Sequence, residues 1–513
     1  MKFPACKGNR LMQTDFRVAA AAAGFMTVMV LVGTWLVRTA AGDEPERTDV
    51  AELIRQGQFA AAEAALRAQI AEPEAPVVGP AARQLEILRR TRMDFTLSAA
   101  DVLQQIQADL PDATAAEVQQ WTDDNLLEHR LIDGEVRYFR RAAGNLFRLD
   151  ADARRRRDAA RAAAADKSPD NQEEQSESTP EFNLREHVRN LVQLAEASDD
   201  PLVAPVQHRV KYTLTVNADH PRVKPGAVVR VWLPYPQQYR QQRDVRLVSS
   251  SPGEPMIASA EAPQRTAHFE QAVRDAEQPL KFAVEFSFVT SAYCPKITAA
   301  AVEPYDRDGE TYRTYTAERL PHIALTSDVR ALAAEIVGDE TNPLEKARRV
   351  FRWVSANIPW CGEMEYSIIP SLSAKGLAAR RGDCGVQGMT FITLCRAAGV
   401  PARWQSGWQT KPGKWNMHDW SEFFVEPWGW LPADASYGVI DDPDPRVADF
   451  FCGRMDPYRL IVNLDYAREL QPAKTSFRSE PNDFQRGEVE IDGHNLYFDE
   501  WDYQFEVETQ PAK

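Results

Sequence analysis

The chain has 513 residues, which is too long for a single hydrophobic core and predicts about three or four folded units. Hydrophobic residues make up 44% of the sequence, enough for globular cores, and charged residues make up an ordinary 26%. The formal net charge of -15 argues against nucleic acid as a partner, because a phosphate backbone is bound by a basic surface.

Residues 1–42 have the pattern of a targeting segment. Basic residues precede an uncharged apolar run from Val18 to Val37, which is long enough to cross a bilayer as a helix. Small residues follow at positions 39–41, as before a signal-peptidase site. Since the positive flank stays inside, we expect an exported protein, periplasmic or at the cell surface. The segment is either a cleaved signal peptide or a retained anchor, and membrane contact is expected only through it.

Residues 43–153 read as a helical and winged-helix-like module. Asp49 to Arg92 is rich in Ala, Leu and Arg, which favours helix. Thr114 and Glu117 form a capping box that opens a further helix. Residues 131–136 then read as a hairpin around Asp-Gly. Without a basic recognition helix, we interpret this module as an interaction or spacer unit.

A charged, Ala-rich stretch over residues 154–182 has the composition of a solvated linker. After a short helix near residues 184–197, apolar residues alternate with polar ones, which indicates half-buried strands. Several short strands at this spacing predict a β-sandwich-like domain over residues 183–300.

Helical periodicity returns in residues 305–445. Asn342 caps a helix with Pro343 at its first position, and its apolar residues recur on one face through Ile358. Residues 446–513 contain two or three further strands, and we expect this C-terminal extension to pack on the preceding unit. The fold class predicted for the whole chain is α+β.

The stretch from Gly382 to Gly438 carries the candidate chemistry. Cys384 stands at the start of a mostly apolar helix that ends at Gly399. The partial positive charge of a helix N-terminus stabilises a thiolate, so we expect the thiol of Cys384 to have a lowered pKa. Asp383 can cap the same helix, which offsets part of that effect.

Three strands follow this helix, over residues 401–409, 418–426 and 430–434. His418 and Asp434 lie at equal distances along the chain from residue 426, so antiparallel pairing of the last two strands brings them together. A helix-borne thiol that faces a sheet-borne His–Asp pair is the arrangement a thiol nucleophile needs: His accepts the thiol proton and Asp orients the imidazole.

This order and spacing resemble the transglutaminase-like superfamily over residues 342–438. The matching pieces are Arg381-Gly-Asp-Cys384-Gly, Leu394-Cys-Arg-Ala-Ala-Gly-Val-Pro-Ala-Arg403, His418-Asp-Trp-Ser-Glu-Phe and Leu431-Pro-Ala-Asp434-Ala-Ser. The resemblance implies a papain-like α+β core, acyl transfer through a thioester, and Cys384, His418 and Asp434 as a catalytic triad. It also implies an oxyanion donor upstream of the cysteine, for which Trp353 and Trp360 are both candidates. No cofactor or metal is implied.

Each of these residues also has a purely structural interpretation. Cys384 can be a buried thiol or a disulfide partner of Cys361, His418 a strand histidine, and Asp434 a turn-capping carboxylate. A metal site is disfavoured because the paired ligand spacing of zinc motifs is missing. Beyond Cys6, the five remaining cysteines are an odd number, which allows two disulfides and one free thiol. Six tryptophans over residues 404–430 are expected to pack in the core, with one or two in a substrate groove.

Three functions compete at this point. The first is an exported thiol hydrolase that cleaves peptide or protein amides through a Cys thioester. The second is a protein-glutamine transamidase, which differs only in the acyl acceptor. The third is a non-catalytic cell-surface binding or scaffold protein, for which replacement of Cys384 would have no effect.

Overall fold

The computed structural model describes residues 49–71, 79–165 and 182–512. The predicted targeting segment, residues 1–42, lies outside them. Residues from Asp49 onward form one compact unit. Among the described residues, no helix has both the length and the apolar character needed to cross a membrane.

The first part of this unit is helical and contains one small hairpin. The Ala- and Leu-rich segment forms three helices, and Thr114 and Glu117 make the predicted capping box at the start of α5. Strands β1 and β2 form the predicted antiparallel hairpin. The elements are α1 (Val50–Arg55), α2 (Phe59–Ile70), α3 (Pro80–Asp94), α4 (Ala99–Asp109), α5 (Ala115–Asp123), β1 (His129–Ile132), β2 (Glu135–Tyr138), α6 (Ala142–Leu149) and α7 (Ala151–Ala165).

Part of the predicted linker, residues 154–182, is helical in the structure. Residues 154–165, predicted as the first part of a solvated linker, belong to α7, because Ala and Arg are strong helix formers even in a highly charged stretch. The rest of the predicted linker, residues 166–181, lies outside the described residues. Helix α8 (Leu184–Glu196) then begins with Asn183 as its N-cap, close to the predicted bounds.

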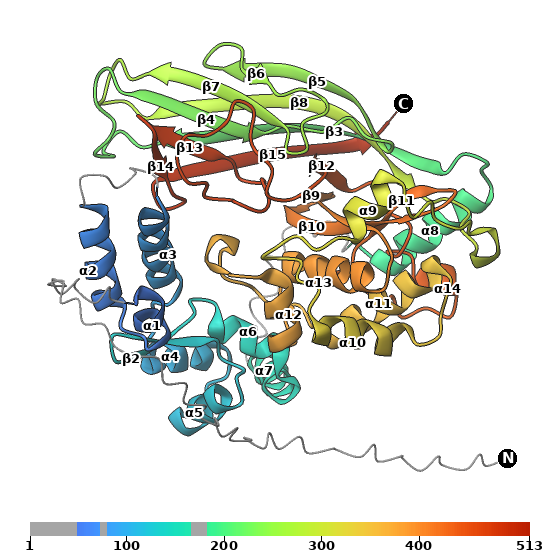
Figure 1. Ribbon diagram of the computed structural model, residues 1–513, viewed down its shortest axis with the longest axis horizontal. Coiled ribbons are helices and arrows are strands. Elements are labelled where there is room, and N and C mark those ends of the chain that lie inside the picture. The colour runs from blue at the N-terminus through green and yellow to red at the C-terminus, as the bar shows by residue number, and fades with distance from the viewer. Residues whose placement is uncertain (1–48, 72–78, 166–181, 513) are drawn as a thin grey trace, which may run out of the picture. The chain divides into compact units, whose positions relative to one another are not determined.

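A β-sandwich follows, and its two sheets lie face to face (Figure 1). One sheet has the order β15-β3-β8-β5 and the other β14-β13-β4-β7-β6. Apolar side chains from both sheets form one buried cluster that includes Phe286 of β8 and Trp232 of β4. The strands are β3 (Leu202–Val216), β4 (Val228–Pro234), β5 (Gln242–Ser251), β6 (Met256–Ile257), β7 (Thr266–Ala272), β8 (Leu280–Tyr293), β13 (Glu488–Ile491), β14 (His494–Leu496) and β15 (Trp501–Pro511).

The predicted β-sandwich-like domain, residues 183–300, contains only part of the observed sandwich. Strand β15 pairs along β3, and β13 pairs with β4, so C-terminal strands complete both sheets of the sandwich. The expectation that residues 446–513 pack on the preceding unit holds for β12 (Arg459–Asn463), which joins the sheet of the core, but not for β13, β14 and β15, which belong to the sandwich. The alternating pattern predicted strands here but could not name their partners, because the pairing joins segments far apart in the chain.

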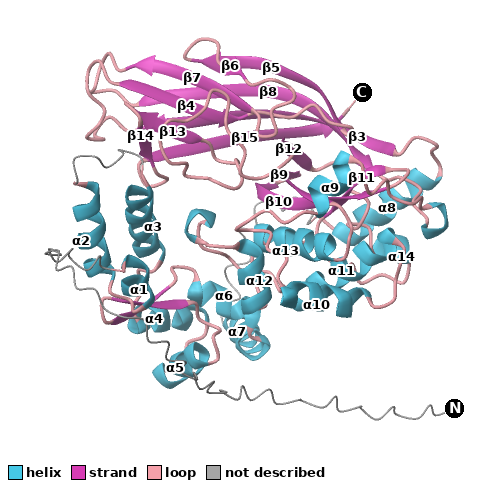
Figure 2. Ribbon diagram, in the orientation of Figure 1, coloured by secondary structure: helices cyan, strands magenta, loops and turns pink. Residues whose placement is uncertain are grey.

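Between these sandwich strands the chain forms an α+β core, as predicted, with helices beside a four-stranded sheet (Figure 2). The sheet has the order β11-β10-β9-β12, and β10 pairs antiparallel with both β9 and β11. The elements are α9 (Glu310–Thr316), α10 (Ser327–Val337), α11 (Pro343–Asn357), α12 (Leu372–Ala379), α13 (Cys384–Ala397), β9 (Ala402–Lys411), β10 (Lys414–Val425), β11 (Gly429–Ala433) and α14 (Pro445–Ala448).

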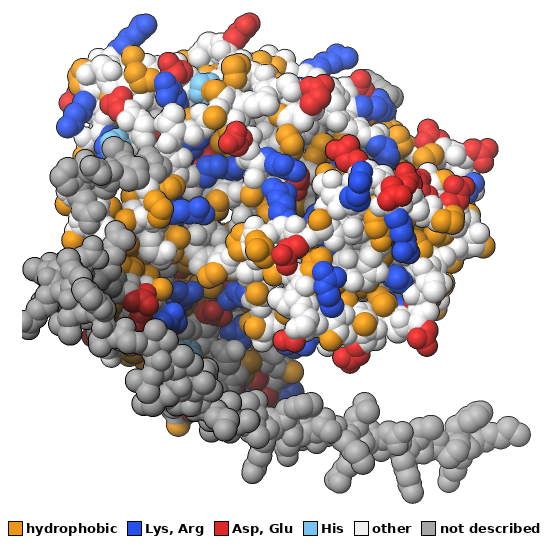
Figure 3. Space-filling view, viewed as in Figure 1, with side chains coloured by type: hydrophobic (Ala, Val, Ile, Leu, Met, Phe, Trp, Pro, Cys, Tyr) orange, Lys and Arg blue, Asp and Glu red, His pale blue; other side chains and the backbone are white. Residues whose placement is uncertain are grey.

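Helix α13 is the centre of this core. All of its residues from Gly385 to Arg396 are buried, and it packs against β10 on one side and α11 and α12 on others. One buried apolar cluster joins this helix to the N-terminal helical module. Acidic and basic side chains are interspersed on the face shown in Figure 3, without a continuous patch of one sign.

Candidate thiol active site

Cys384 is the first residue of α13. Asp383 is the N-cap, and its carboxylate accepts a hydrogen bond from the main-chain N–H of Val386 at 3.3 Å. Asp is favoured at this position because its side chain satisfies a main-chain donor that the helix leaves free. The predicted placement of the thiol at a helix N-terminus is therefore present in the structure.

The antiparallel pairing of β10 and β11 brings His418 and Asp434 together. Nε2 of His418 lies 2.7 Å from Oδ2 of Asp434, and both side chains are buried. This leaves Nδ1 as the ring nitrogen that can face another group. The geometric prediction for this pair holds, whereas the catalytic role of the two residues stays a prediction.

Arg459, on β12, is a partner of Asp434 that the sequence did not indicate. Its Nη2 donates to the same carboxylate oxygen at 2.9 Å, and its Nη1 donates to Asp456 at 3.0 Å. Burial works to raise the pKa of Asp434, but His418 and Arg459 outweigh it and hold that pKa below its ordinary value. Asp434 is thus ionised, and its charge is shared between an imidazole and a guanidinium.

The thiol of Cys384 points at Asp419, the residue after His418. Its Sγ donates to Oδ2 of Asp419 at 3.5 Å, whereas no hydrogen bond between Cys384 and His418 occurs among the described residues. The expected low thiol pKa is wrong: burial and the carboxylates of Asp419 and Asp383 raise it well above its ordinary value. These effects exceed the partial charge of one helix end, which is worth about 1 kcal/mol.

Tyr366 links the two carboxylates beside the thiol. Its hydroxyl lies 2.9 Å from Oδ1 of Asp383 and 2.9 Å from Oδ2 of Asp419, and it accepts from the N–H of Gly385 at 3.0 Å. A hydroxyl has one proton, so it can donate to only one carboxylate at a time. Burial raises the pKa of Asp383 to about 6. Burial and the charge of Asp383 raise that of Asp419 to about 8.

Gly385 allows this close approach. A Cβ at this position would lie 2.1 Å from the hydroxyl oxygen of Tyr366, so any side chain displaces the tyrosine. We expect Gly385→Ala to separate Tyr366 from Asp383 and Asp419 and to lower the melting temperature by several degrees, which differential scanning calorimetry would measure. Gly144→Ala is the control for removal of a helical glycine, because Gly144 also lies within a helix, α6, and its Cβ would meet no atom within 4 Å. Equal losses in both variants would contradict the steric argument.

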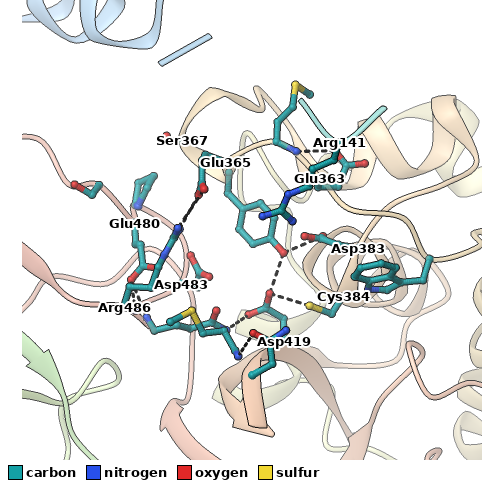
Figure 4. Close-up of a pocket in the computed structure, with 18 residues that line it drawn as sticks. Arg141, Glu363, Glu365, Ser367, Asp383, Cys384, Asp419, Glu480, Asp483 and Arg486 are labelled. Carbon is teal, nitrogen blue, oxygen red and sulfur yellow. Dashed lines mark hydrogen bonds and ion pairs between the residues drawn. The ribbon is translucent and has the colours of Figure 1, made fainter. Parts of the chain in front are cut away.

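A cavity opens beside the thiol, and several chain segments line it (Figure 4). They are Glu363–Ser367, Asn416–Met417 with Asp419, and residues 479–486, together with Arg141, Trp360, Asp383 and Cys384. Gln485 donates to Oδ1 of Asp419 at 2.7 Å, which ties the C-terminal segment to the site. The cavity is therefore lined by parts of the chain that no sequence pattern connected with one another.

The N-terminal module supports one wall of this cavity. The side-chain amide of Asn145 donates to the carbonyl of Gly362 and accepts from its N–H, both at 2.8 Å. Asp94 accepts from the N–H of Glu365 at 3.0 Å. The module was predicted to be a spacer or interaction unit, but these contacts and Arg141 make it part of the site.

Of the two candidate oxyanion donors, only Trp360 lines the cavity with Cys384. Trp353 instead lies under the guanidinium of Arg380, 4.8 Å from the ring centroid. Among the six tryptophans over residues 404–430, Trp404, Trp408 and Trp420 are fully buried, as expected for core packing. None of the six lines this cavity, so the predicted groove role is not supported for them.

The five cysteines of the described residues are all free, and four of them are buried. The predicted alternative of a disulfide between Cys384 and Cys361 is therefore wrong. No cluster of His, Cys, Asp and Glu suited to a metal ion occurs within the described part of the chain.

Comparisons with known proteins agree with this core. Residues 330–435 match the family model of the transglutaminase-like superfamily. A Haemophilus influenzae protein of uncharacterised function is 25% identical over 214 residues, which cover 34% of this chain and 56% of that protein. The chain thus spans little more than half the length of this relative.

Two solved structures are also similar in part. One, from Cytophaga hutchinsonii and provisionally assigned as a cysteine protease, is 13% identical with a TM-score of 0.41, over 60% of this chain and 91% of that chain. The periplasmic domain of TgpA from Pseudomonas aeruginosa is 17% identical with a TM-score of 0.23, over 48% and 91%. Residues 330–435 of the α+β core, which carry the helix-borne thiol and the sheet-borne imidazole, therefore match the transglutaminase-like superfamily.

Proposed function

We propose that the protein is an exported thiol hydrolase that cleaves peptide or protein amide bonds through a thioester on Cys384. The observation that carries the proposal is the position of Cys384 at the start of α13, in a cavity, within a core that also holds His418 and Asp434 2.7 Å apart. A thiol, an imidazole and an orienting carboxylate in one matched core are the parts needed for acyl transfer.

The reaction begins with a change of partner for the thiol. In the resting arrangement its proton faces Asp419, so Cys384 must turn toward His418 before the imidazole can accept that proton. The thiolate then attacks the amide carbonyl, the imidazolium donates its proton to the leaving amine, and a thioester remains. Water, deprotonated by His418, hydrolyses the thioester and releases the acid.

The negative charge of the tetrahedral intermediate needs donors on the carbonyl oxygen. The main-chain N–H of Cys384, free at a helix N-terminus, and the indole N–H of Trp360 are the proposed pair. Trp360 suits this role because it lines the cavity and remains 38% exposed, so a substrate can reach it. Loss of one such donor typically reduces kcat by about a hundredfold or more.

Export is proposed from the sequence of residues 1–42, and the membrane is a partner only if this segment is retained. A transamidase differs from a hydrolase in the final acceptor alone, so both share every step up to the thioester. Water is the proposed acceptor because the cavity is open to solvent at Trp360.

The proposal is tested with the full-length protein and a library of peptide amides, by mass spectrometry of the products. We expect hydrolysed products from the wild type and none from Cys384→Ala. The variant Cys452→Ala, which removes a buried cysteine without a proposed catalytic role, is the matched control and should leave cleavage intact. Products that incorporate added dansylcadaverine in place of water would establish the transamidase instead. If the wild type forms neither hydrolysed nor amine-labelled products, the non-catalytic scaffold hypothesis is favoured.

A further inference from the structure

The cavity beside Cys384 has a surplus of carboxylates. Six acidic side chains line it, against two guanidinium groups, Arg141 and Arg486. The acidic residues are Glu363, Glu365, Asp383, Asp419, Glu480 and Asp483. Burying several like charges is costly unless each is paired or protonated, so the partners of these groups decide what the cavity can bind.

Three of the six carboxylates have a cation of the protein beside them. Glu363 lies 3.3 Å from Nζ of Lys375, and Glu365 and Glu480 lie 2.6 and 2.7 Å from the guanidinium of Arg486. The positive charge of Arg486 is therefore already divided between two carboxylates. Arg141 makes no ion pair within 4.0 Å among the described residues, but its charge acts on Asp383 and Glu365.

Asp483 stands apart from this pairing. It is only 6% exposed, yet its carboxylate has neither a hydrogen-bond donor on another residue nor an ion-pair partner within the described parts of the chain. Figure 4 shows it inside the ring of labelled residues, with no dashed contact to any of them. A carboxyl that is this buried, lines a cavity and has no partner on the protein is satisfied by water or by a ligand group. Burial and the charges of Glu480 and Asp419 raise the pKa of Asp483 well above its ordinary value, and a bound cation would favour its ionised form again.

We propose that this cavity binds a positively charged group of the substrate, an ammonium or guanidinium, with Asp483 as its counter-ion and Asp419 beside it. The inference rests on the proposed thiol hydrolase and names its substrate class: peptides with a basic group next to the amide that is cleaved. Both residues line the same cavity as Cys384, so a cation held there places the neighbouring carbonyl at the thiol.

The same cation also acts on the nucleophile. Asp419 receives the thiol hydrogen bond, and the charges of Asp419 and Asp383 oppose ionisation of Cys384. A bound cation offsets those charges and frees the thiol to ionise. Recognition of a basic substrate and activation of the nucleophile are therefore coupled through one set of carboxylates, and neutral or acidic peptides lack both effects.

A first experiment measures binding preference without requiring turnover. Cys384 is modified by methanethiosulfonates that carry a trimethylammonium or a sulfonate group, and the ratio of the two rates is compared with that for 2-mercaptoethanol. Cys384→Ala corrects for other thiols. We expect the cationic reagent to be favoured at least tenfold, and Asp483→Asn to remove most of this preference while Asp483→Glu keeps it. The exposed Asp308→Asn is the charge-matched control.

A second experiment compares peptide amides that differ only in Lys, norleucine or Glu beside the scissile amide. We expect kcat/KM for the Lys peptide to exceed the norleucine value at least tenfold, and this ratio to fall in Asp483→Asn. Cleavage without any charge preference would overturn the inference and leave the hydrolase standing. Charge preference in the first experiment with no cleavage of any peptide would reject the hydrolase and leave the cation site. A modification ratio equal to that of 2-mercaptoethanol would reject the site.

Discussion

Replacement of His418 by alanine is expected to reduce kcat/KM for amide cleavage about a thousandfold, because general-base catalysis contributes a factor of that order. The Cys384 thiol depends on a base because its own ionisation is unfavourable. Cys384 lies beside Asp419 and Asp383, which help to hold the pKa of its thiol well above the ordinary value, so few molecules carry a thiolate without a base. Residual activity should rise steeply with pH, since hydroxide must then remove the proton that the imidazole accepts in the wild type.

The pH profile separates this role from a structural one. Loss of the bond between His418 and Asp434 also removes a buried contact, so a fall in activity alone is ambiguous. His494→Ala, on the exposed side of β14, is the control for histidine removal and should leave both rate and profile unchanged. A His418→Ala enzyme with reduced activity but the wild-type pH profile would show that His418 is not the base.

Replacement of Asp419 by asparagine is expected to increase alkylation of Cys384 by iodoacetamide at pH 9 at least tenfold. Asp419 has a pKa of about 8, below that of the thiol, so in the wild type the thiol must ionise beside a carboxylate that is already charged. Asparagine keeps the shape and an acceptor for Gln485 but removes that charge. Each unit by which the thiol pKa falls raises the thiolate fraction tenfold.

The same substitution should change the pH dependence of stability. The pKa of Asp419 rises from an ordinary 3.8 to about 8 in the folded protein, so between these values the unfolded chain is ionised while the folded chain still holds the proton. Stability is lost as pH rises across that window. Asp419→Asn should therefore raise the melting temperature more at pH 8 than at pH 4. Equal shifts at both pH values, or the same effect in Asp308→Asn, would contradict this account.

Local patterns were enough to predict the frame of the site. The alternation and turn residues over 401–434 indicated three strands, and β9, β10 and β11 follow them closely. Antiparallel pairing then predicted that His418 and Asp434 lie close together. Their 2.7 Å contact confirms this, although the strands pair about residue 427 and not 426. The helix that starts at Cys384 was visible from its cap and its glycine end, because both signals depend on residues adjacent in the chain.

The electrostatics of the site were not predictable in this way. The sequence shows Asp419 directly after His418. Whether the thiol faces His418 or Asp419, however, depends on the side-chain conformation of Cys384, which no sequence pattern indicates. Tyr366 begins a single short 3-10 turn and Asp483 lies in a loop, so neither belongs to a segment with a periodic pattern. Arg459 reaches Asp434 from a strand beyond the matched motifs. The pKa of the Cys384 thiol depends on the carboxylates around it as well as on the helix N-terminus. A prediction from the helix N-terminus alone therefore had the wrong direction for the pKa shift.

The pairing of β15 with β3 has a consequence for co-translational folding. One edge of β3 pairs with β8, but its other edge, along residues 206–216, has its partner only once residues 501–511 have been synthesised. Gln485, which donates to Asp419, is synthesised about a hundred residues after Cys384. Domains usually fold in the order of their synthesis, but here one sheet of the sandwich and the thiol site both need segments that lie far downstream in the chain. A nascent chain that has passed Cys384 therefore carries an incomplete site, and the nucleophile and the acidic wall come together only after residues 479–486 have been synthesised.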